Sequence, residues 1–440
     1  MMLQKSKKKY YGSFWGSSFP CIKILEKKTQ IYYRGCSMNC HVIGMPYAKV
    51  TKEMCWDAHT YKQYKFMKMM HGKDNMNFLY YGHRDSDVSC DEFIPCFDDE
   101  VLINTYGEIF NGNYFVGSHI DDYAHLTLNK NASRSIRENF SEGDLIMNFW
   151  QISGLSLFNK YGLPYDNMVD VGHGSMATPI SRYVSYESYW IYSYLWGRKQ
   201  EKENLTPAIR ESQYHAVIPL MTDLDDFTYV EEKDDYYLYF SRVIPLKGII
   251  TVMLLAHLEP DKKFVVAGYK GLVEDHLLYY TLDGIKYDWD YFISRENVEY
   301  LGGVFDPKIR DELYGNAKAL LMCSEYGEPF GGTVSEAHAC GTPVISVDWG
   351  AFIENNPKGF TGFHCRTIAD WRNALEKIEE IKPKNCRSFV EENYSLEVVS
   401  DLYENFFRRC NDYILDRGEY DKETSYRSFG HREIRGCQYT

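Results

Sequence analysis

The feature that most constrains the fold of this chain is an alternation of short apolar runs with helical segments in its second half. The strand-like runs lie at 236–240, 264–268, 298–301, 319–322 and 343–347, and the helical segments lie near 248–258, 307–316 and 333–340. Strand, helix and strand at this spacing are typical of a parallel sheet. The second half is therefore predicted to be a doubly wound, Rossmann-like α/β domain.

A weaker rhythm of the same kind runs through the first half. Strands are predicted at 40–46, 77–81, 144–147, 167–171 and 215–219, a helix at 56–71, a buried aromatic helix at 186–196 and a surface loop at 197–212. A length of 440 residues suits two domains. Two facing doubly wound domains would place a ligand in the cleft at the carboxyl ends of their strands.

The predicted organisation has four parts. These are an extension of unknown role at 1–38, a first domain at 39–220, a second domain at 221–400, and amphipathic helices that pack back on the first domain, with a loose tail, at 401–440. No long aromatic or charged repeat interrupts this plan. The plan is that of two Rossmann-like domains on one chain.

Composition limits the kinds of partner that the chain can be expected to bind and the compartment in which it can be expected to act. The net charge of −13 argues against a nucleic-acid binder, since phosphate contacts need clustered Lys and Arg. No apolar run reaches the roughly 18–20 residues that span a bilayer, and no signal peptide is recognised. The 12 scattered cysteines then indicate reduced thiols and a cytoplasmic location. The stretch from Cys36 to Cys40-His41 hints at metal, but no second ligand pair follows at finger spacing.

The stretch SEYGEPFGGTVSEA, residues 324–337, carries two glutamates on either side of a glycine pair. The glycines lie between a predicted strand and a predicted helix, where backbone amides can approach a ligand. Glu328 precedes a proline and is predicted to project from the loop, where a carboxylate suits paired hydrogen bonds to sugar hydroxyls. Glu336 has two interpretations, because Thr333-x-x-Glu336 also fits a capping box that would tie down its own helix start.

Two cations share the loop that follows the first strand of the second domain. Arg242 and Lys247 stand just before Gly248 and the next predicted helix. Arg offers planar two-point contacts and Lys a mobile point charge, and together they can neutralise a diphosphate. Two basic residues in one loop are more often simply solvated, but the preceding strand and the glycine favour the functional interpretation.

Read in order, these motifs resemble the carboxyl-terminal half of retaining GT-B glycosyltransferases of family four. The segments that carry the resemblance are Phe240-Ser241-Arg242, Lys247-Gly248, Val266-Ala267-Gly268, Leu301-Gly302-Gly303, Glu328-Pro329-Phe330-Gly331, Glu336-Ala337 and Gly341-Thr342-Pro343-Val344-Ile345. They span about 240–350. The first half is similar to a narrower group of virus- and phage-encoded members through Trp56-Asp57-Ala58 and Tyr186-Glu187-Ser188-Tyr189, as is Asp348-Trp349-Gly350-Ala351.

The resemblance implies a role for each matching position. The second domain would bind a UDP- or GDP-linked hexose, and the first domain would bind a glycan or other hydroxyl acceptor. Arg242 and Lys247 would hold the donor diphosphate, Glu328 the transferred sugar, and Glu336 the ribose hydroxyls. The sugar and phosphates would also contact the backbone amides of Phe330, Gly331 and Gly332 and the nearby Thr333, and the base would pack near Gly303 and Val304.

Members of this family keep the anomeric configuration by same-face attack, in which the leaving phosphate helps to deprotonate the acceptor. The resemblance therefore implies no paired carboxylates of the glycosidase type, no metal and no other cofactor. His173, just past a predicted strand, matches a loop histidine that many members place near the transferred sugar, and is either catalytic or a plain loop residue. Met45-Pro46-Tyr47 lacks the glycine pair that many members show after their first strand.

Two other classes of function are considered. A nicotinamide-dependent oxidoreductase needs Gly-x-Gly-x-x-Gly directly after a first strand, and neither Met45-Pro46 nor Arg242-Val243 supplies it. A catalytically inactive module that only binds sugar nucleotide has no need of Arg242, Lys247 and both glutamates together. The preferred hypothesis is an active glycosyltransferase.

Overall fold

The computed structural model describes residues 37–107, 119–150, 154–203, 214–270, 278–280, 284 and 286–415. They belong to one compact unit, Ser37–Thr440. Nearly all of the predicted extension at 1–38, including Cys36, lies outside these residues, as does the tail after 415. Within the described part, no helix is both long enough and apolar enough to cross a membrane.

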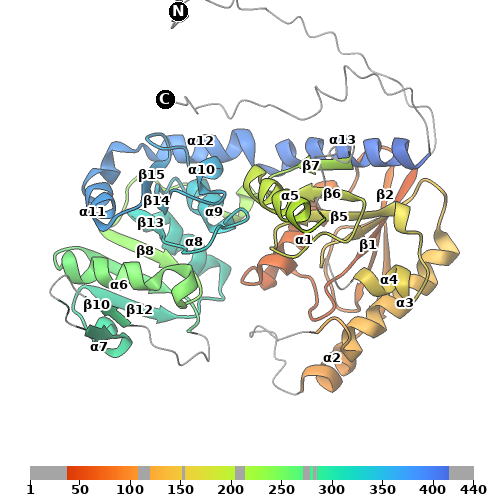
Figure 1. Cartoon of the computed structure of the whole chain (residues 1–440), viewed down its shortest axis with the longest axis horizontal. Coiled ribbons are helices and arrows are strands. Elements are labelled where there is room, and N and C mark those ends of the chain that lie inside the picture. The colour runs from red at the N-terminus through yellow and green to blue at the C-terminus, as the bar shows by residue number, and fades with distance from the viewer. Residues whose placement is uncertain are drawn as a thin grey trace, which may run out of the picture. The chain divides into compact units, whose positions relative to one another are not determined.

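The first domain is built on a parallel sheet with the strand order β3-β2-β1-β4-β5-β6-β7 (Figure 1). The strands are β1 Met38–Ile43, β2 Met76–His83, β3 Glu92–Phe97, β4 Leu145–Asn148, β5 Met168–His173, β6 Tyr183–Tyr186 and β7 His215–Val217. The helices are α1 Ala58–Met70, α2 Asp99–Tyr106, α3 Tyr123–Asn139, α4 Leu155–Asn159 and α5 Tyr189–Glu203. The chain order reverses between β1 and β4, which makes the sheet doubly wound.

The second domain repeats this architecture with the strand order β12-β9-β8-β13-β14-β15. Its strands are β8 Tyr236–Phe240, β9 Lys263–Ala267, β12 Val298–Gly302, β13 Ala319–Met322, β14 Val344–Val347 and β15 Gly362–Cys365. Its helices are α6 Ile249–Leu258, α7 Trp289–Ile293, α8 Pro307–Asn316, α9 Gly332–Ala339, α10 Phe352–Asn355, α11 Ile368–Lys377 and α12 Pro383–Asn393, beside a hairpin of β10 Leu278–Tyr280 and β11 Lys286–Asp288. The order reverses between β8 and β13, so the carboxyl ends of these two strands form a switch point.

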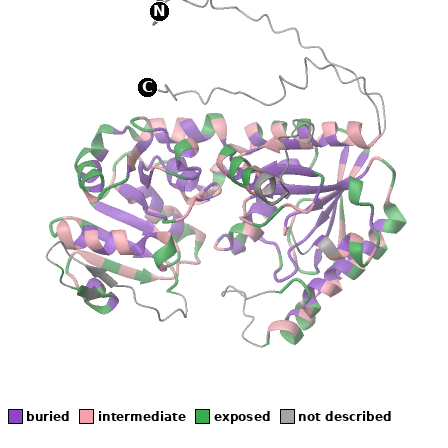
Figure 2. Ribbon diagram, in the orientation of Figure 1, coloured by how far each residue is buried: buried purple, intermediate pink, exposed green. Residues whose placement is uncertain are grey.

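Each sheet is covered by apolar side chains, and the strands are largely buried (Figure 2). The last described helix, α13 Leu396–Ile414, belongs to the core of the first domain although it follows the second domain in sequence. Its Tyr403 and Phe407 meet Phe66 of α1 edge to face, with ring centroids 5.3 and 6.0 Å apart. Edge-to-face aromatic pairs add to the stability gained from burying their area, so α13 fastens the end of the chain to the first sheet.

The segment at 186–203 differs from its prediction. Tyr186 ends strand β6, and the helix α5 begins only at Tyr189 and continues to Glu203 through residues predicted as a loop. The prediction of a buried helix is wrong, since Tyr189 and Tyr194 are exposed and the inward face is carried by Ile191 and Leu195. The charged run after Gly197 consists of Arg, Lys, Gln and Glu, which are good helix formers. Residues 204–212 lie outside the described part.

Gly248 fixes the junction between the loop after β8 and the start of α6. Its φ of +78° lies in the left-handed region that glycine adopts without a steric cost. A Cβ atom here would also lie 1.9 Å from the carbonyl oxygen of Cys323, which directly follows β13. The absence of a side chain therefore allows the loops after β8 and β13 to lie in direct contact.

We expect Gly248→Ala to lower the free energy of unfolding by clearly more than Gly72→Ala. Gly72 has a similar φ of +81°, but a Cβ there meets nothing within 4 Å. Gly72→Ala should therefore show only the conformational cost of about 1–2 kcal/mol, and Gly248→Ala that cost plus the clash with Cys323. Denaturant unfolding of both variants measures the difference, and equal losses would contradict the close approach.

Candidate functional site

The loops that follow β8 and β13 meet at the switch point of the second sheet. The backbone N–H of Glu325 donates to the carbonyl oxygen of Leu246 over 3.0 Å, which joins the two loops directly. From the first loop Lys247 extends its Nζ to within 2.6 Å of Oε1 of Glu328 in the second. Two residues that are 81 positions apart thus form an ion pair at the carboxyl end of the sheet.

Glu328 is enclosed by hydrogen-bond donors. Besides Lys247, the hydroxyl of Ser324 donates to Oε1 and that of Tyr326 donates to Oε2, each over 2.7 Å. Burial is the largest of the causes that raise the pKa of Tyr326, so the phenol stays protonated as a donor. Only 5% of Glu328 is exposed. Glu328, predicted to project from its loop, is thus held by donors from its own loop and from the loop after β8.

Glu336 does not cap its own helix. Helix α9 begins after Gly331, and Gly331 provides no side-chain cap. Thr333 lies inside the first turn, and its hydroxyl donates to the sulfur of Met322 over 3.4 Å. The capping-box interpretation is thus wrong, since the helix starts too early for Thr333 to be its N-cap residue.

Glu336 instead belongs to a buried polar group shared with α8. The hydroxyl of Tyr314 donates to Oε2 of Glu336 over 3.2 Å, and Nη1 of Arg310 lies 3.7 Å from Oε1. Arg310 also donates from Nη1 to the carbonyl oxygen of Cys55 over 2.9 Å. The second glutamate of the quoted stretch is therefore held in place by residues that sequence analysis did not single out.

Arg242 differs from Lys247 in its surroundings. Its side chain is exposed, and its guanidinium forms no ion pair or hydrogen bond with another described residue. Its backbone is held, because the hydroxyl of the buried Tyr239 donates to the carbonyl oxygen of Arg242 over 2.8 Å. The structure thus places a solvated guanidinium and a paired ammonium on the same short loop.

The remaining predicted donor-site residues flank these loops. Phe330 is buried against Tyr394, Gly331 has a φ of +79°, and Gly332 opens α9. Gly303 and Val304 follow the end of β12. The amino terminus of α9 and the residues after β12 therefore lie at the carboxyl end of the same sheet as Lys247, which is the end where ligands bind in this architecture.

His173 is the last residue of β5 and not a loop residue as predicted, and it is only 1% exposed. Its Nε2 lies 2.9 Å from the carbonyl oxygen of Ala177 and therefore carries the ring proton. Nδ1 is then an acceptor, and it is buried without a hydrogen-bond partner. Burial is the largest cause that lowers the pKa of this imidazole.

The Glu328 loop also receives contacts from the segment that follows β6. The hydroxyl of Ser188 donates to the carbonyl oxygen of Pro329. The ring of Trp190 lies so close to Gly327 that a Cβ there would be 2.0 Å from it. Neither Ser188 nor Trp190 was a predicted site residue, although Ser188 lies in the quoted stretch Tyr186 to Tyr189.

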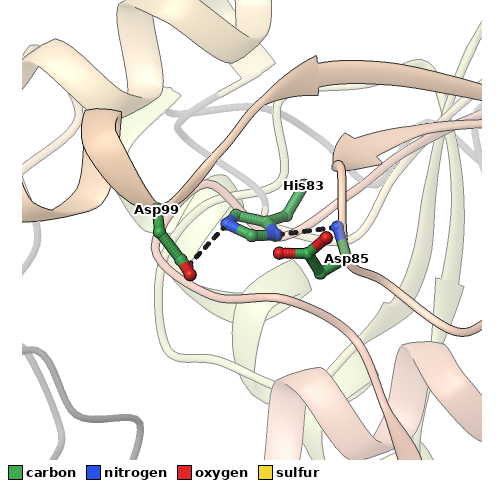
Figure 3. Close-up of side chains that lie close together, drawn as sticks. All are labelled: His83, Asp85 and Asp99. Atoms are coloured by element: carbon green, nitrogen blue, oxygen red, sulfur yellow. Dashed lines mark hydrogen bonds and ion pairs between the residues drawn. The ribbon is translucent and has the colours of Figure 1, made fainter.

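Among the described residues, one group of three could offer ligand atoms to a metal: His83, Asp85 and Asp99 (Figure 3). Nδ1 of His83 accepts the backbone N–H of Asp85 over 3.1 Å, and Nε2 lies 3.1 Å from Asp99. The neutral ring therefore carries its proton on Nε2, the nitrogen that a metal would need. The hydrogen bonding favours a histidine–carboxylate pair over a metal centre.

Part of the chain is similar to known proteins. Residues 222–395 match the family model for Glycosyl transferases group 1. A D-inositol 3-phosphate glycosyltransferase of Rhodococcus erythropolis is 32% identical over 114 residues, which are 24% of this chain and 26% of that protein. One of Gordonia bronchialis is 40% identical over 63 residues, 14% of each chain. These matches span about a quarter or less of either relative, and they support the predicted glycosyltransferase resemblance without reaching family four.

Solved structures match over nearly the whole described chain. A glycosyltransferase involved in avilamycin A biosynthesis has a TM-score of 0.59 at 17% identity, covering 85% of this chain and 98% of its own. Sucrose-phosphate synthase of Thermosynechococcus elongatus has a TM-score of 0.55 at 15% identity, covering 84% and 98%. HepE of Anabaena, solved with UDP-glucose, has 0.54 at 14%, covering 84% and 99%. The predicted GT-B fold of two Rossmann-like domains is confirmed.

The Lys247–Glu328 pair should couple strongly in stability. Glu328→Ala leaves a largely buried ammonium without its partner, and we expect a loss of about 3 kcal/mol in the free energy of unfolding. Combining it with Lys247→Met should cost less than the sum of the two single changes, with a coupling energy of about 1 kcal/mol or more.

The matched control is the exposed pair Lys263 and Glu299, whose charged atoms lie 2.7 Å apart on neighbouring strands. A cycle of Lys263→Met and Glu299→Ala should give a coupling of well under 1 kcal/mol. Similar coupling energies in the two cycles, measured by denaturant unfolding, would contradict the strong enclosure of Glu328.

Proposed function

We propose that this chain is a retaining glycosyltransferase that moves a hexose from a UDP- or GDP-sugar to a hydroxyl group of a glycan or other acceptor. The observation that carries the proposal is the cluster of Lys247, Tyr326 and Glu328 at the joined carboxyl ends of β8 and β13. It lies in the segment that matches Glycosyl transferases group 1. The Anabaena structure with UDP-glucose, a protein of the same fold, supports the choice of a nucleotide-sugar donor.

Arg242 and Lys247 would bind the donor diphosphate. The exposed guanidinium of Arg242 has charge and donors to offer, and the amino terminus of α9 adds a favourable potential for phosphate. As the bond to the sugar breaks, negative charge grows on the leaving nucleotide diphosphate, and preorganised cations stabilise it. This arrangement supports transfer without a divalent metal or another cofactor.

Glu328 would bind hydroxyls of the transferred sugar. Lys247, Ser324 and Tyr326 fix the position of its carboxylate by hydrogen bonds. A diphosphate that attracts Lys247 would free lone pairs on Oε1 for sugar hydroxyls. Donor binding and sugar recognition would then be linked through one shared lysine.

Glu336 would grip the ribose hydroxyls, and the base would pack near Gly303 and Val304. Tyr314 and Arg310 hold the carboxylate of Glu336 at a fixed place, which suits bidentate recognition of neighbouring hydroxyls. His173 would serve the acceptor side of the reaction. Retention would follow from attack on the same face as the departing diphosphate, which would accept the proton of the acceptor hydroxyl. The narrower resemblance to virus- and phage-encoded members stays a prediction.

Removing the cations of the β8 loop should weaken donor binding. We expect Arg242→Ala and Lys247→Gln each to raise the Kd for UDP or GDP, whichever binds the parent, by about 10-fold or more, because each removes a charge-assisted contact to phosphate. Calorimetry on the full chain measures this. Arg84→Ala, an exposed arginine of the first domain, should leave the Kd unchanged, and unchanged affinity in the first two variants would remove the diphosphate assignment.

Glu328→Gln should abolish most sugar transfer while leaving the affinity for the free nucleotide diphosphate within a few-fold. The amide keeps the size of the side chain but loses the charge that recognises the sugar hydroxyls. Transfer is followed with the donor that stabilises the parent in a thermal-shift screen of UDP-, GDP- and ADP-sugars. The parent reaction is repeated in EDTA, where full activity is expected, and the anomer of the product is read by NMR.

Full transfer by folded Glu328→Gln would overturn the role of this residue. An inverted product would overturn retention. Nucleotide-sugar binding by the parent without transfer or donor hydrolysis would instead favour the inactive binding module.

A further inference from the structure

A buried ion pair of the first domain is not used by the proposed donor site. Nζ of Lys62, on α1, donates to Oε1 of Glu187 over 3.0 Å and to the carbonyl oxygen of Gly172 over 2.7 Å. The Lys62 and Glu187 side chains are 5% and 10% exposed. Burying two charges is costly unless the geometry is well satisfied, so a pair in this position invites a functional explanation.

The pair surrounds the backbone of His173. Lys62 holds the carbonyl oxygen of Gly172, the residue before it, and the N–H of Glu187 donates to the carbonyl oxygen of His173 over 3.3 Å. A Cβ on Gly174, the residue after it, would lie 2.1 Å from Oε2 of Glu187. Residues 172, 173 and 174 therefore each contact Lys62 or Glu187, and the end of β5 is fixed from both sides.

The same segment continues towards the donor site. Glu187 is followed by Ser188, whose hydroxyl donates to the carbonyl oxygen of Pro329 beside Glu328. The stretch Tyr186-Glu187-Ser188-Tyr189 thus touches His173 at one end and the Glu328 loop at the other. The proposed function so far gives this stretch no task.

We propose that Lys62 and Glu187 are positioning residues that hold His173 at the acceptor side of the reaction and, through Ser188, keep it in register with the Glu328 loop. The inference rests on the proposed function and names the residues that act through His173. Lys62 connects the end of β5 to α1, and Glu187 connects it to the segment after β6, whose Ser188 contacts the donor loop. Neither residue needs to touch a substrate.

The charges of the pair make the proposal testable, since they act on His173 in opposite directions. Burial most strongly lowers the pKa of His173, Asp170 raises it, Lys62 lowers it and Glu187 raises it. The ring of Tyr186 also faces His173, with centroids 5.7 Å apart. The same two charges act on the buried His59 of α1, but burial lowers the pKa of His59 to about 4. Removing Lys62 should therefore raise the pKa of His173, and removing Glu187 should lower it.

The experiment compares Lys62→Met and Glu187→Gln in the full chain. We expect each to lower kcat by about 10-fold or more with the Kd for the nucleotide diphosphate within twofold of the parent. The acidic limb of the pH profile of kcat/KM should move to higher pH in Lys62→Met and to lower pH in Glu187→Gln. His173→Gln should remove that limb. Lys68→Met, on the same helix but paired with Asp223, should leave rate and profile unchanged.

Shifts of the two limbs in the same direction, or no shift in either, would overturn the proposal, because two opposite charges held beside His173 must move its pKa in opposite directions. A kcat close to that of the parent in both variants would also overturn it, because a pair that only stabilises the fold leaves the rate of the folded enzyme unchanged. If one single variant does not fold, the double variant Lys62→Met/Glu187→Gln removes both charges. The acidic limb of its pH profile should then lie close to that of the parent. A limb far from the parent in this double variant would also overturn the proposal.

NMR titration of the His173 ring separates this inference from the proposed function. If the parent neither binds nucleotide diphosphate nor transfers sugar, the proposed function fails. Opposite shifts of the His173 pKa in the two variants would still support the positioning pair, and parallel or absent shifts would refute it.

Discussion

The pairing of β8 with β13 is the constraint on which the rest of the second domain depends. The two strands are parallel neighbours, with Tyr237 opposite Ala319 and Leu238 opposite Leu320, although nearly the whole β9–β12 half of the sheet separates them in sequence. Where the strand order of a parallel sheet reverses, the connections that follow the two neighbouring strands run to opposite faces of the sheet. The loops after β8 and β13 therefore separate at this point and leave a space between them, where their polar side chains can meet. Lys247 and Glu328 do so.

This arrangement explains how far the sequence could predict the site. The apolar runs that became β8, β9, β13 and β14 are strong signals, because strands buried on both faces leave little room for polar residues. Sequence patterns predicted the structure less well where contacts between distant segments determine which residues are buried. Strand β3 has only its last residues fully buried, and helix α5 presents aromatics to solvent, so neither shows a clean period.

The side-chain partners of the two glutamates could not be read from local patterns. Arg310 and Tyr314 lie 26 and 22 positions before Glu336 and reach it only because α8 and α9 pack together. Thr333-x-x-Glu336 fits a capping box in sequence, yet the glycine pair lets α9 begin two residues sooner. Tyr326 and Ser324 are the exception, since both lie within four residues of Glu328 in the stretch 324–337. Because these hydroxyls are so close to Glu328 in sequence, their hydrogen bonds to it could have been predicted.

The glycines around Glu328 limit which substitutions its loop can accept. A Cβ on Gly350 would meet the backbone nitrogen of Glu328 at 2.7 Å, one on Gly327 the ring of Trp190, and one on Gly331 the ring of Phe352 at 2.7 Å. Neighbouring atoms thus approach the Glu328 loop closely at three glycines, where a side chain would clash with them. A side chain at any of these three glycines would therefore have to displace one of these neighbours, so the shape of the loop around Glu328 depends on residues that have no side chain.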